Sequence, residues 1–157
     1  MTIRSAPIIF SPTIPKEPAI IEFTPRRLIW AGPLTVVLAN LVNLLFYAVT
    51  RALGERYLIT IAGPAKPAVP MPIVSIVLAT SVATVGAMLI FAGLLKISHV
   101  PLPPFLSIAA AALLVSFGGP FSLAGDTTLL TKFLLCTMHV LTALTVVAGL
   151  ICLTRKK

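Results

Sequence analysis

The first long apolar run of the chain is residues 28–50, which read LIWAGPLTVVLANLVNLLFYAVT without a charged residue. As an α-helix this run rises about 34 Å, more than the roughly 30 Å of a bilayer's hydrocarbon core. Arg26 and Arg27 precede it, but the run is too long and begins too late in the chain for a secretory signal peptide. The run is therefore predicted to be a retained membrane-spanning helix.

Three further apolar runs follow, and the same reasoning predicts a membrane-spanning helix for each. They cover about residues 73–95, 105–124 and 133–153, and none of them contains Asp, Glu, Lys or Arg. Gly118, Gly119 and Pro120 are predicted to kink the third run near its end. The predicted fold class is all-α, an integral membrane bundle of four transmembrane helices that run up-down-up-down.

Composition supports a chain that uses lipid as its solvent. Of the 157 residues, 58% are hydrophobic and 10% are charged, and the mean hydropathy is +1.07. A soluble domain is about 45–50% apolar and about 25% charged, and a small domain leaves much of its surface in water. These values exclude an ordinary soluble enzyme, a secreted disulfide scaffold and a disordered chain, and they make the lipid bilayer the first predicted partner.

Positive charge predicts orientation rather than nucleic-acid binding. The formal net charge is +8, and the basic residues flank the apolar runs instead of alternating with aromatic residues. Four spans place both termini on one side, and Lys and Arg prefer the cytoplasmic side. The terminal side would hold Arg4, Lys16, Arg26, Arg27, Lys96, Arg155, Lys156 and Lys157, and the opposite side only Arg51, Arg56, Lys66 and Lys132. We therefore predict a bacterial cytoplasmic (inner) membrane protein with both termini in the cytoplasm.

Segments outside the spans divide the chain further. Residues 1–25 are predicted to be an extended, proline-rich cytoplasmic arm, and residues 26–157 form the transmembrane domain. The arm is also rich in Ile and Phe, so docking on a membrane or partner and a mobile, sticky arm remain equal alternatives. In the long loop at residues 51–72, residues 56–61 are either a short strand or a turn. Asp126 is predicted to cap the fourth helix.

Small residues recur in the second span. Ala79, Ala83 and Ala87 are four residues apart, and Gly86 and Gly93 are seven apart. Small side chains let helices approach closely in lipid, so this face is a candidate for a close helix contact. The alternative is that Ala and Gly are simply common in membrane helices.

Polar side chains inside the spans are predicted to meet in a layer. If the first span runs outward and the fourth inward, Asn43 and His139 lie at one depth, and Asn40 and Thr142 lie at another. Antiparallel packing then predicts Asn43–His139 and Asn40–Thr142 contacts. The candidate intramembrane polar layer comprises Asn40, Asn43, Thr84, Ser116, His139 and Thr142.

Three interpretations of this layer remain open. The side chains can serve as hydrogen bonds between helices, or they can line a small polar cavity that binds a ligand. In the third interpretation His139 is an axial ligand to a haem or chlorophyll-type pigment, although a lone histidine is weak support for it. No other cofactor is predicted.

The chain lacks the residues of familiar active sites. No P-loop, dinucleotide fingerprint, HExxH motif or nucleophile elbow is present, and the absence of charge within the spans argues against an ion-coupled pump. Cys136 and Cys152 are too far apart on one helix to form a disulfide. We therefore predict a protein that is not an enzyme, with no catalytic residues and no metal site.

Two stretches carry a resemblance to a known family. They are ANLVNLLFY at residues 39–47 and GGPFSLAGDTTLLTKFLLCTMHVLTA at residues 118–143. They resemble an uncharacterised family of bacterial four-span membrane proteins, a domain of unknown function, over roughly residues 26–153. The motif positions that carry this resemblance are Pro120, Ser122, Asp126, Met138 and His139. The resemblance implies the four-span architecture and no known activity.

Two functions are compatible with these features. The first is a structural or accessory protein that packs against itself as a homo-oligomer, or against the subunits of a larger membrane complex. The alternative is a small-molecule binding or permeation protein that uses the intramembrane polar layer.

Overall fold

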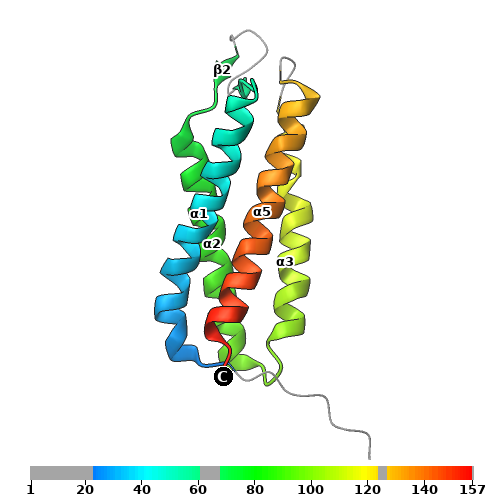
Figure 1. Ribbon diagram of the computed structural model, residues 1–157. Helices are drawn as coiled ribbons and strands as arrows, with labels where there is room; N and C mark the ends of the chain where they lie inside the picture. Colours follow the sequence, from blue (N-terminus) through cyan, green and yellow to red (C-terminus); the bar gives the residue numbers. More distant parts are fainter. Residues whose placement is uncertain (1–22, 61–67, 124–126, 157) are drawn as a thin grey trace, which may run out of the picture.

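The computed structural model describes residues 23–60, 68–123 and 127–156 (Figure 1). The predicted N-terminal arm, residues 1–25, lies outside this part of the chain except for its last three residues. In chain order the elements are the 3₁₀-helix η1 (Pro25–Arg27), α1 (Leu28–Ala52), β1 (Leu58–Ile59), β2 (Val69–Pro70), α2 (Ile73–Ile97), α3 (Leu102–Ser116), α4 (Gly118–Ser122) and α5 (Leu129–Thr154).

The described chain has four helical segments that are long and apolar enough to cross a membrane, and this confirms the prediction of four apolar helices. They are α1 extended by η1, α2, α3 together with α4, and α5. Large apolar side chains cover their outer faces; Leu45, Val82 and Leu144 are 66%, 71% and 63% exposed. A soluble protein rarely leaves so much apolar surface open, whereas lipid tails would cover it.

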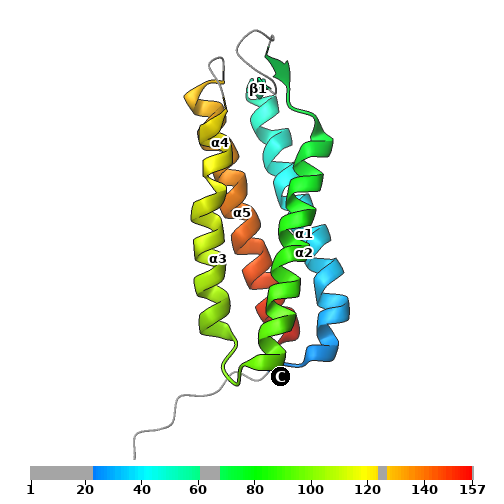
Figure 2. The same ribbon diagram turned by 180° about the vertical axis from the view of Figure 1, so that it is seen from behind.

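Consecutive long helices traverse the bundle in opposite directions, and α1 packs against both α2 and α5 (Figures 1 and 2). At one end, antiparallel pairing of Leu58 with Pro70 in β1 and β2 connects the end of α1 to the start of α2. At the other end, the Thr24 backbone N–H donates to the Thr154 carbonyl at 2.9 Å. We call these the hairpin end and the terminal end of the bundle.

Within the third apolar segment the helix is interrupted. Pro103 and Pro104 fall in the first turn of α3, where a missing N–H is tolerated. Phe117 then separates α3 from α4, directly before the Gly118–Gly119–Pro120 sequence. The interruption lies where the glycines and proline predict a kink, because these residues weaken helical hydrogen bonding.

The start of α5 differs from the prediction. Its first residue is Leu129, and the residue before it, Thr128, accepts a hydrogen bond from the Thr131 backbone N–H at 3.1 Å through its side-chain Oγ1. An N-cap must directly precede the first helical residue, so Thr128 is the cap and the prediction of Asp126 is wrong. Asp126 lies outside the described residues.

Glycine brings α1 close to its neighbours. A Cβ atom placed on Gly149 of α5 would lie 2.8 Å from Oγ1 and 3.0 Å from Cγ2 of Thr35 in α1. A Cβ on Gly32 of α1 would collide with the Met88 side chain of α2. The close helix contacts of this bundle are therefore made by the glycines of α1 and α5.

The small residues of α2 make no close helix contact at its glycines within the described chain. A Cβ on Gly86 or Gly93 would meet nothing within 4 Å there. Ala79, Ala83 and Ala87 line a cavity, and Ala79 and Ala83 are exposed. The reason is that α3 packs less closely on the other helices than α1 does, so the alanines of α2 have no neighbour to approach.

The loop after α1 folds back over the hairpin end. Of the two alternatives for residues 56–61, the structure forms a strand at Leu58–Ile59. The Tyr57 side chain is fully buried, and its hydroxyl lies 2.7 Å from Thr50 Oγ1. Glu55 Oε1 accepts hydrogen bonds from the Tyr57 backbone N–H at 3.0 Å and from Thr131 Oγ1 at 2.9 Å. These bonds tie the loop to both α1 and α5.

Two apolar cores lie on either side of the predicted polar layer. The core at the hairpin end contains Tyr47, Tyr57, Ile59, Met71, Ile76, Leu135 and Met138. The core at the terminal end contains Leu28, Ala39, Phe91, Phe105, Val146 and Leu150. Asn43 sits on α1 one turn from Ala39 and one turn from Tyr47, so its amide lies between the two cores.

Candidate ligand cavity between the helices

A cavity of about 480 Å³ lies between α2, α3 and α5. This volume falls within the roughly 300–1,000 Å³ of typical ligand sites, and the walls are mainly apolar, as such sites usually are. The lining residues are Asn43, Ile59, Met71, Ser75, Ile76, Ala79, Thr80, Ala83, Ala87, Phe105, Ala109, Ala112, Leu113, Ser116, Gly119, Pro120, Leu123, Leu135, Met138, His139, Thr142, Ala143, Val146 and Val147.

Short side chains create this space. Alanines face it from all three helices, including Ala83 of α2, Ala112 of α3 and Ala143 of α5. Side chains of this size cannot fill the gap between helices that do not approach closely. The loop at the hairpin end contributes Ile59 and Met71, and Phe105 forms part of the wall toward the terminal end.

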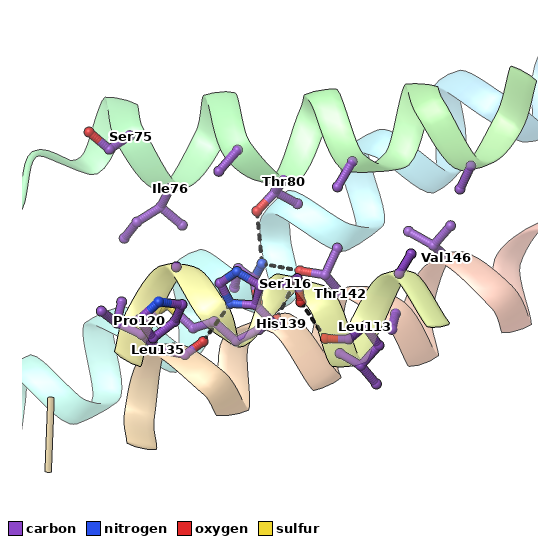
Figure 3. A pocket seen from close by; sticks show the side chains of 18 of the residues that line it. Ser75, Ile76, Thr80, Leu113, Ser116, Pro120, Leu135, His139, Thr142 and Val146 are labelled. Carbon is purple, nitrogen blue, oxygen red and sulfur yellow. Dashed lines mark hydrogen bonds between the residues drawn. The ribbon is translucent and has the colours of Figure 1, made fainter. Parts of the chain in front are cut away.

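Asn43 provides the main polar contact in the cavity wall. Its side chain is 2% exposed, and its Nδ2 donates to Thr80 Oγ1 at 2.8 Å and to Thr142 Oγ1 at 2.7 Å (Figure 3). The Thr142 hydroxyl in turn donates to the Met138 carbonyl at 2.9 Å. Since that proton is committed, Thr142 can only accept from Asn43, and this fixes the orientation of the amide. The amide therefore joins α1 to both α2 and α5.

Neither predicted contact, Asn43–His139 or Asn40–Thr142, forms, and each asparagine bonds to other groups. Asn43 bonds to Thr142 and not to His139, and Asn40 Nδ2 donates to Ser81 Oγ at 3.0 Å and to the Val36 carbonyl at 2.9 Å instead of to Thr142. The depth estimate aligned the midpoints of the two apolar runs. In the structure α5 lies three residues, nearly one helical turn, further along α1 toward the hairpin end than this alignment gives, and Thr142 takes the place expected for His139.

Four of the six candidate residues line the cavity: Asn43, Ser116, His139 and Thr142. The other two candidates, Asn40 and Thr84, do not, and the buried Thr84 hydroxyl donates to the Thr80 carbonyl at 2.7 Å. The candidate set omitted Thr80, although its position one turn before Thr84 on the same face of the span was a usable signal.

Residues 23–156 match the family described as "Family of unknown function (DUF6069)". The chain belongs to this family. The match covers all four long helices and every residue that lines the cavity, so the cavity lies within the family domain of this DUF6069 member. No curated protein and no solved structure matches the chain.

In this DUF6069 protein, His139 presents one nitrogen to its own helix. Its Nδ1 lies 2.8 Å from the Leu135 carbonyl oxygen (Figure 3). A carbonyl can only accept, so Nδ1 carries the hydrogen. In the neutral imidazole the other nitrogen, Nε2, is then an acceptor, and no partner for it is found within the described part of the chain.

The described cavity walls contain no charged side chain that would pair with a charged ligand. The described residues that line the cavity include no Lys, Arg, Asp or Glu. The described residues also contain no group of three or more His, Cys, Asp or Glu side chains that would hold a metal ion. A haem at His139 would bring carboxylates that need cationic partners, so the lining gives the pigment interpretation no support. The arrangement suits a neutral, mainly apolar molecule.

Proposed function

We propose that this DUF6069 protein binds a small, mainly apolar molecule in the cavity between α2, α3 and α5. The observation that carries the proposal is the cavity itself, about 480 Å³ in volume, with a polar level at Asn43, Thr142 and His139. Lining residues such as Ala79, Ala83 and Ala112 are exposed, so the cavity opens to the outside of the bundle and a small molecule can enter it. The proposed role is binding or permeation without chemistry on the ligand.

Native mass spectrometry of the full chain, released from mild detergent, tests this proposal. We expect the protein to carry one small molecule of a few hundred daltons that extraction with organic solvent removes. A chain without any such adduct that instead holds a second polypeptide in fixed ratio would contradict the binding role. That result would favour the accessory role in a larger complex.

We further propose that the four helices cross a bacterial inner membrane up-down-up-down, with both termini in the cytoplasm. The charges at the two ends support this orientation. Basic residues at the terminal end include Arg26, Arg27, Lys96, Arg155 and Lys156, and those at the hairpin end include Arg51, Arg56 and Lys132.

Reporter fusions test the orientation. A cytoplasm-active reporter such as a fluorescent protein should be active at either terminus, and a reporter that requires export should be active only when inserted in the loop at residues 61–67. Activity of the export-dependent reporter at one or both termini would show that the proposed orientation is wrong.

A further inference from the structure

We infer that the occupant of the cavity is a neutral amphiphile with a hydroxyl group, an alcohol or a phenol, and that this hydroxyl donates a hydrogen bond to Nε2 of His139. The inference rests on the proposed binding function and adds the chemical class of the ligand. It follows from the hydrogen bonds already made by the polar side chains that line the cavity.

Most donors near His139 are already used. Both Nδ2 hydrogens of Asn43 bond to threonine hydroxyls. The Thr142 hydroxyl donates to the Met138 carbonyl, and the Ser116 hydroxyl donates to the Leu113 carbonyl at 2.7 Å. The Thr80 hydroxyl accepts from Asn43 and donates to no residue of the described chain, so it can donate to the ligand oxygen while that oxygen's own hydrogen goes to His139.

His139 Nε2 is an acceptor in the cavity wall that has no partner among the described residues. The bond from Nδ1 to the Leu135 carbonyl fixes the tautomer, and it turns the lone pair of Nε2 away from the α5 backbone. Figure 3 shows His139 among the side chains that line the cavity, on the same helix as Thr142. A ligand that complements this nitrogen must bring the hydrogen itself, which an alcohol or phenol does and an ether, ester or ketone does not.

The rest of the cavity suits an apolar chain. On α2 the lining extends from Ser75 to Ala87, a rise of about 18 Å along the helix. Toward the terminal end the wall consists of apolar side chains, among them Ala87, Phe105 and Val147. A hydroxyl near His139 would leave this apolar portion for the hydrocarbon part of the ligand.

The absence of charged side chains excludes an anionic headgroup. The described lining contains no Lys or Arg, and burying a carboxylate or phosphate without a cationic or hydrogen-bonded partner is strongly unfavourable. The ligand class is therefore a neutral alcohol or phenol rather than a fatty acid or a phospholipid headgroup.

Three probe molecules of similar shape test the inference: 4-nonylphenol, its methyl ether 4-nonylanisole, and 4-nonylbenzoate. Binding to the purified full chain is measured by native mass spectrometry. We expect 4-nonylphenol to bind about fivefold to tenfold more tightly than 4-nonylanisole, the effect of one additional hydrogen bond. The benzoate should bind more weakly than either neutral probe.

Nitrogen-15 NMR tests whether His139 Nε2 is the atom that accepts the hydrogen bond from the ligand hydroxyl. In a His99→Gln background, 4-nonylphenol should shift the ¹⁵N signal of His139 Nε2, and 4-nonylanisole should leave it unchanged. His139→Leu should abolish the preference for the phenol while leaving the affinity for the ether within about twofold, because only the acceptor is lost. These spectra and the wild-type affinities do not depend on any variant of His139 folding.

The possible failures can be told apart. If phenol and ether bind wild-type protein equally, or if the benzoate binds as well as the phenol, the hydroxyl requirement is wrong and the binding role stands. If 4-nonylphenol binds without shifting the Nε2 signal, His139 is not the acceptor. If none of the three probes binds, the proposed binding function itself is overturned.

Discussion

Gly149→Leu should separate α1 from α5 and destabilise the bundle strongly. A Cβ atom at position 149 would already lie 2.8 Å from Thr35 Oγ1 and 3.0 Å from Thr35 Cγ2. Thr35 is fully buried, its branched side chain has few rotamers, and its hydroxyl bonds to the Ala31 carbonyl at 2.7 Å. It therefore cannot move aside easily. Overpacking typically costs about 1–3 kcal/mol, and we expect the upper end here.

Gly93→Leu is the matched control for this substitution. Gly93 also lies within a long apolar helix, but a Cβ atom there would meet nothing within 4 Å in the described chain. Leucine is the better helix former by up to about 1 kcal/mol, so this variant should be as stable as wild type or more so. Thermal unfolding in detergent, followed by circular dichroism, measures both. Equal melting temperatures for the two variants would show that the α1–α5 contact does not depend on Gly149.

The four apolar helices were predictable because length and the absence of charge decide them. In lipid, the backbone N–H and C=O groups of a run such as residues 28–50 must form hydrogen bonds within the run itself, and only a helix allows this for a single segment. Helix ends were less predictable. Thr128 rather than Asp126 caps α5, because two polar residues near one turn can both supply an oxygen and the sequence does not show which precedes the first helical residue.

Part of the candidate cavity was also predictable. Asn43, Ser116, His139 and Thr142 could be found because polar side chains within a span must find partners or face a cavity. Their pairing could not be found, since it depends on the relative register of α1 and α5, and helix packing sets this register three residues away from the one that matched midpoints give, so Thr142 takes the place expected for His139. That the alanines of α2 line the cavity could not be predicted, because spacing alone does not show whether a helix lies opposite them.

The shape of the cavity depends on the close packing of α1 against α2 and α5. Gly32 and Gly149 let α1 pack tightly on α2 and α5, which gives α2 and α5 a rigid support. The Asn43 amide of α1 bonds to Thr80 of α2 and to Thr142 of α5, and so joins the two helices that form these cavity walls. With two walls held in place, α3 completes the cavity and need not pack closely. Substitutions on α3 should therefore alter binding with little effect on folding.

Ala112→Phe should abolish binding of 4-nonylphenol, with at least about a tenfold loss of affinity because the ligand loses most of its apolar contact area. Ala112 lies on α3 and lines the cavity. A phenyl ring at this position would project into space that the hydrocarbon chain needs. Since Ala112 is exposed and lines the open cavity, the ring displaces no packed side chain, and the melting temperature should stay the same or rise.

Ala111→Phe is the matched control, because it places the same ring on the same helix one residue earlier. Ala111 and Ala112 are both exposed, but only Ala112 lines the cavity, and one step along a helix turns a side chain by about 100°, so the ring at position 111 would point away from the cavity. This variant should bind 4-nonylphenol as tightly as wild type, and native mass spectrometry measures both affinities. If Ala112→Phe folds and still binds at wild-type affinity, the ligand site lies elsewhere. If both variants lose binding equally, the loss comes from a general effect on α3, and occupation of the cavity cannot explain it.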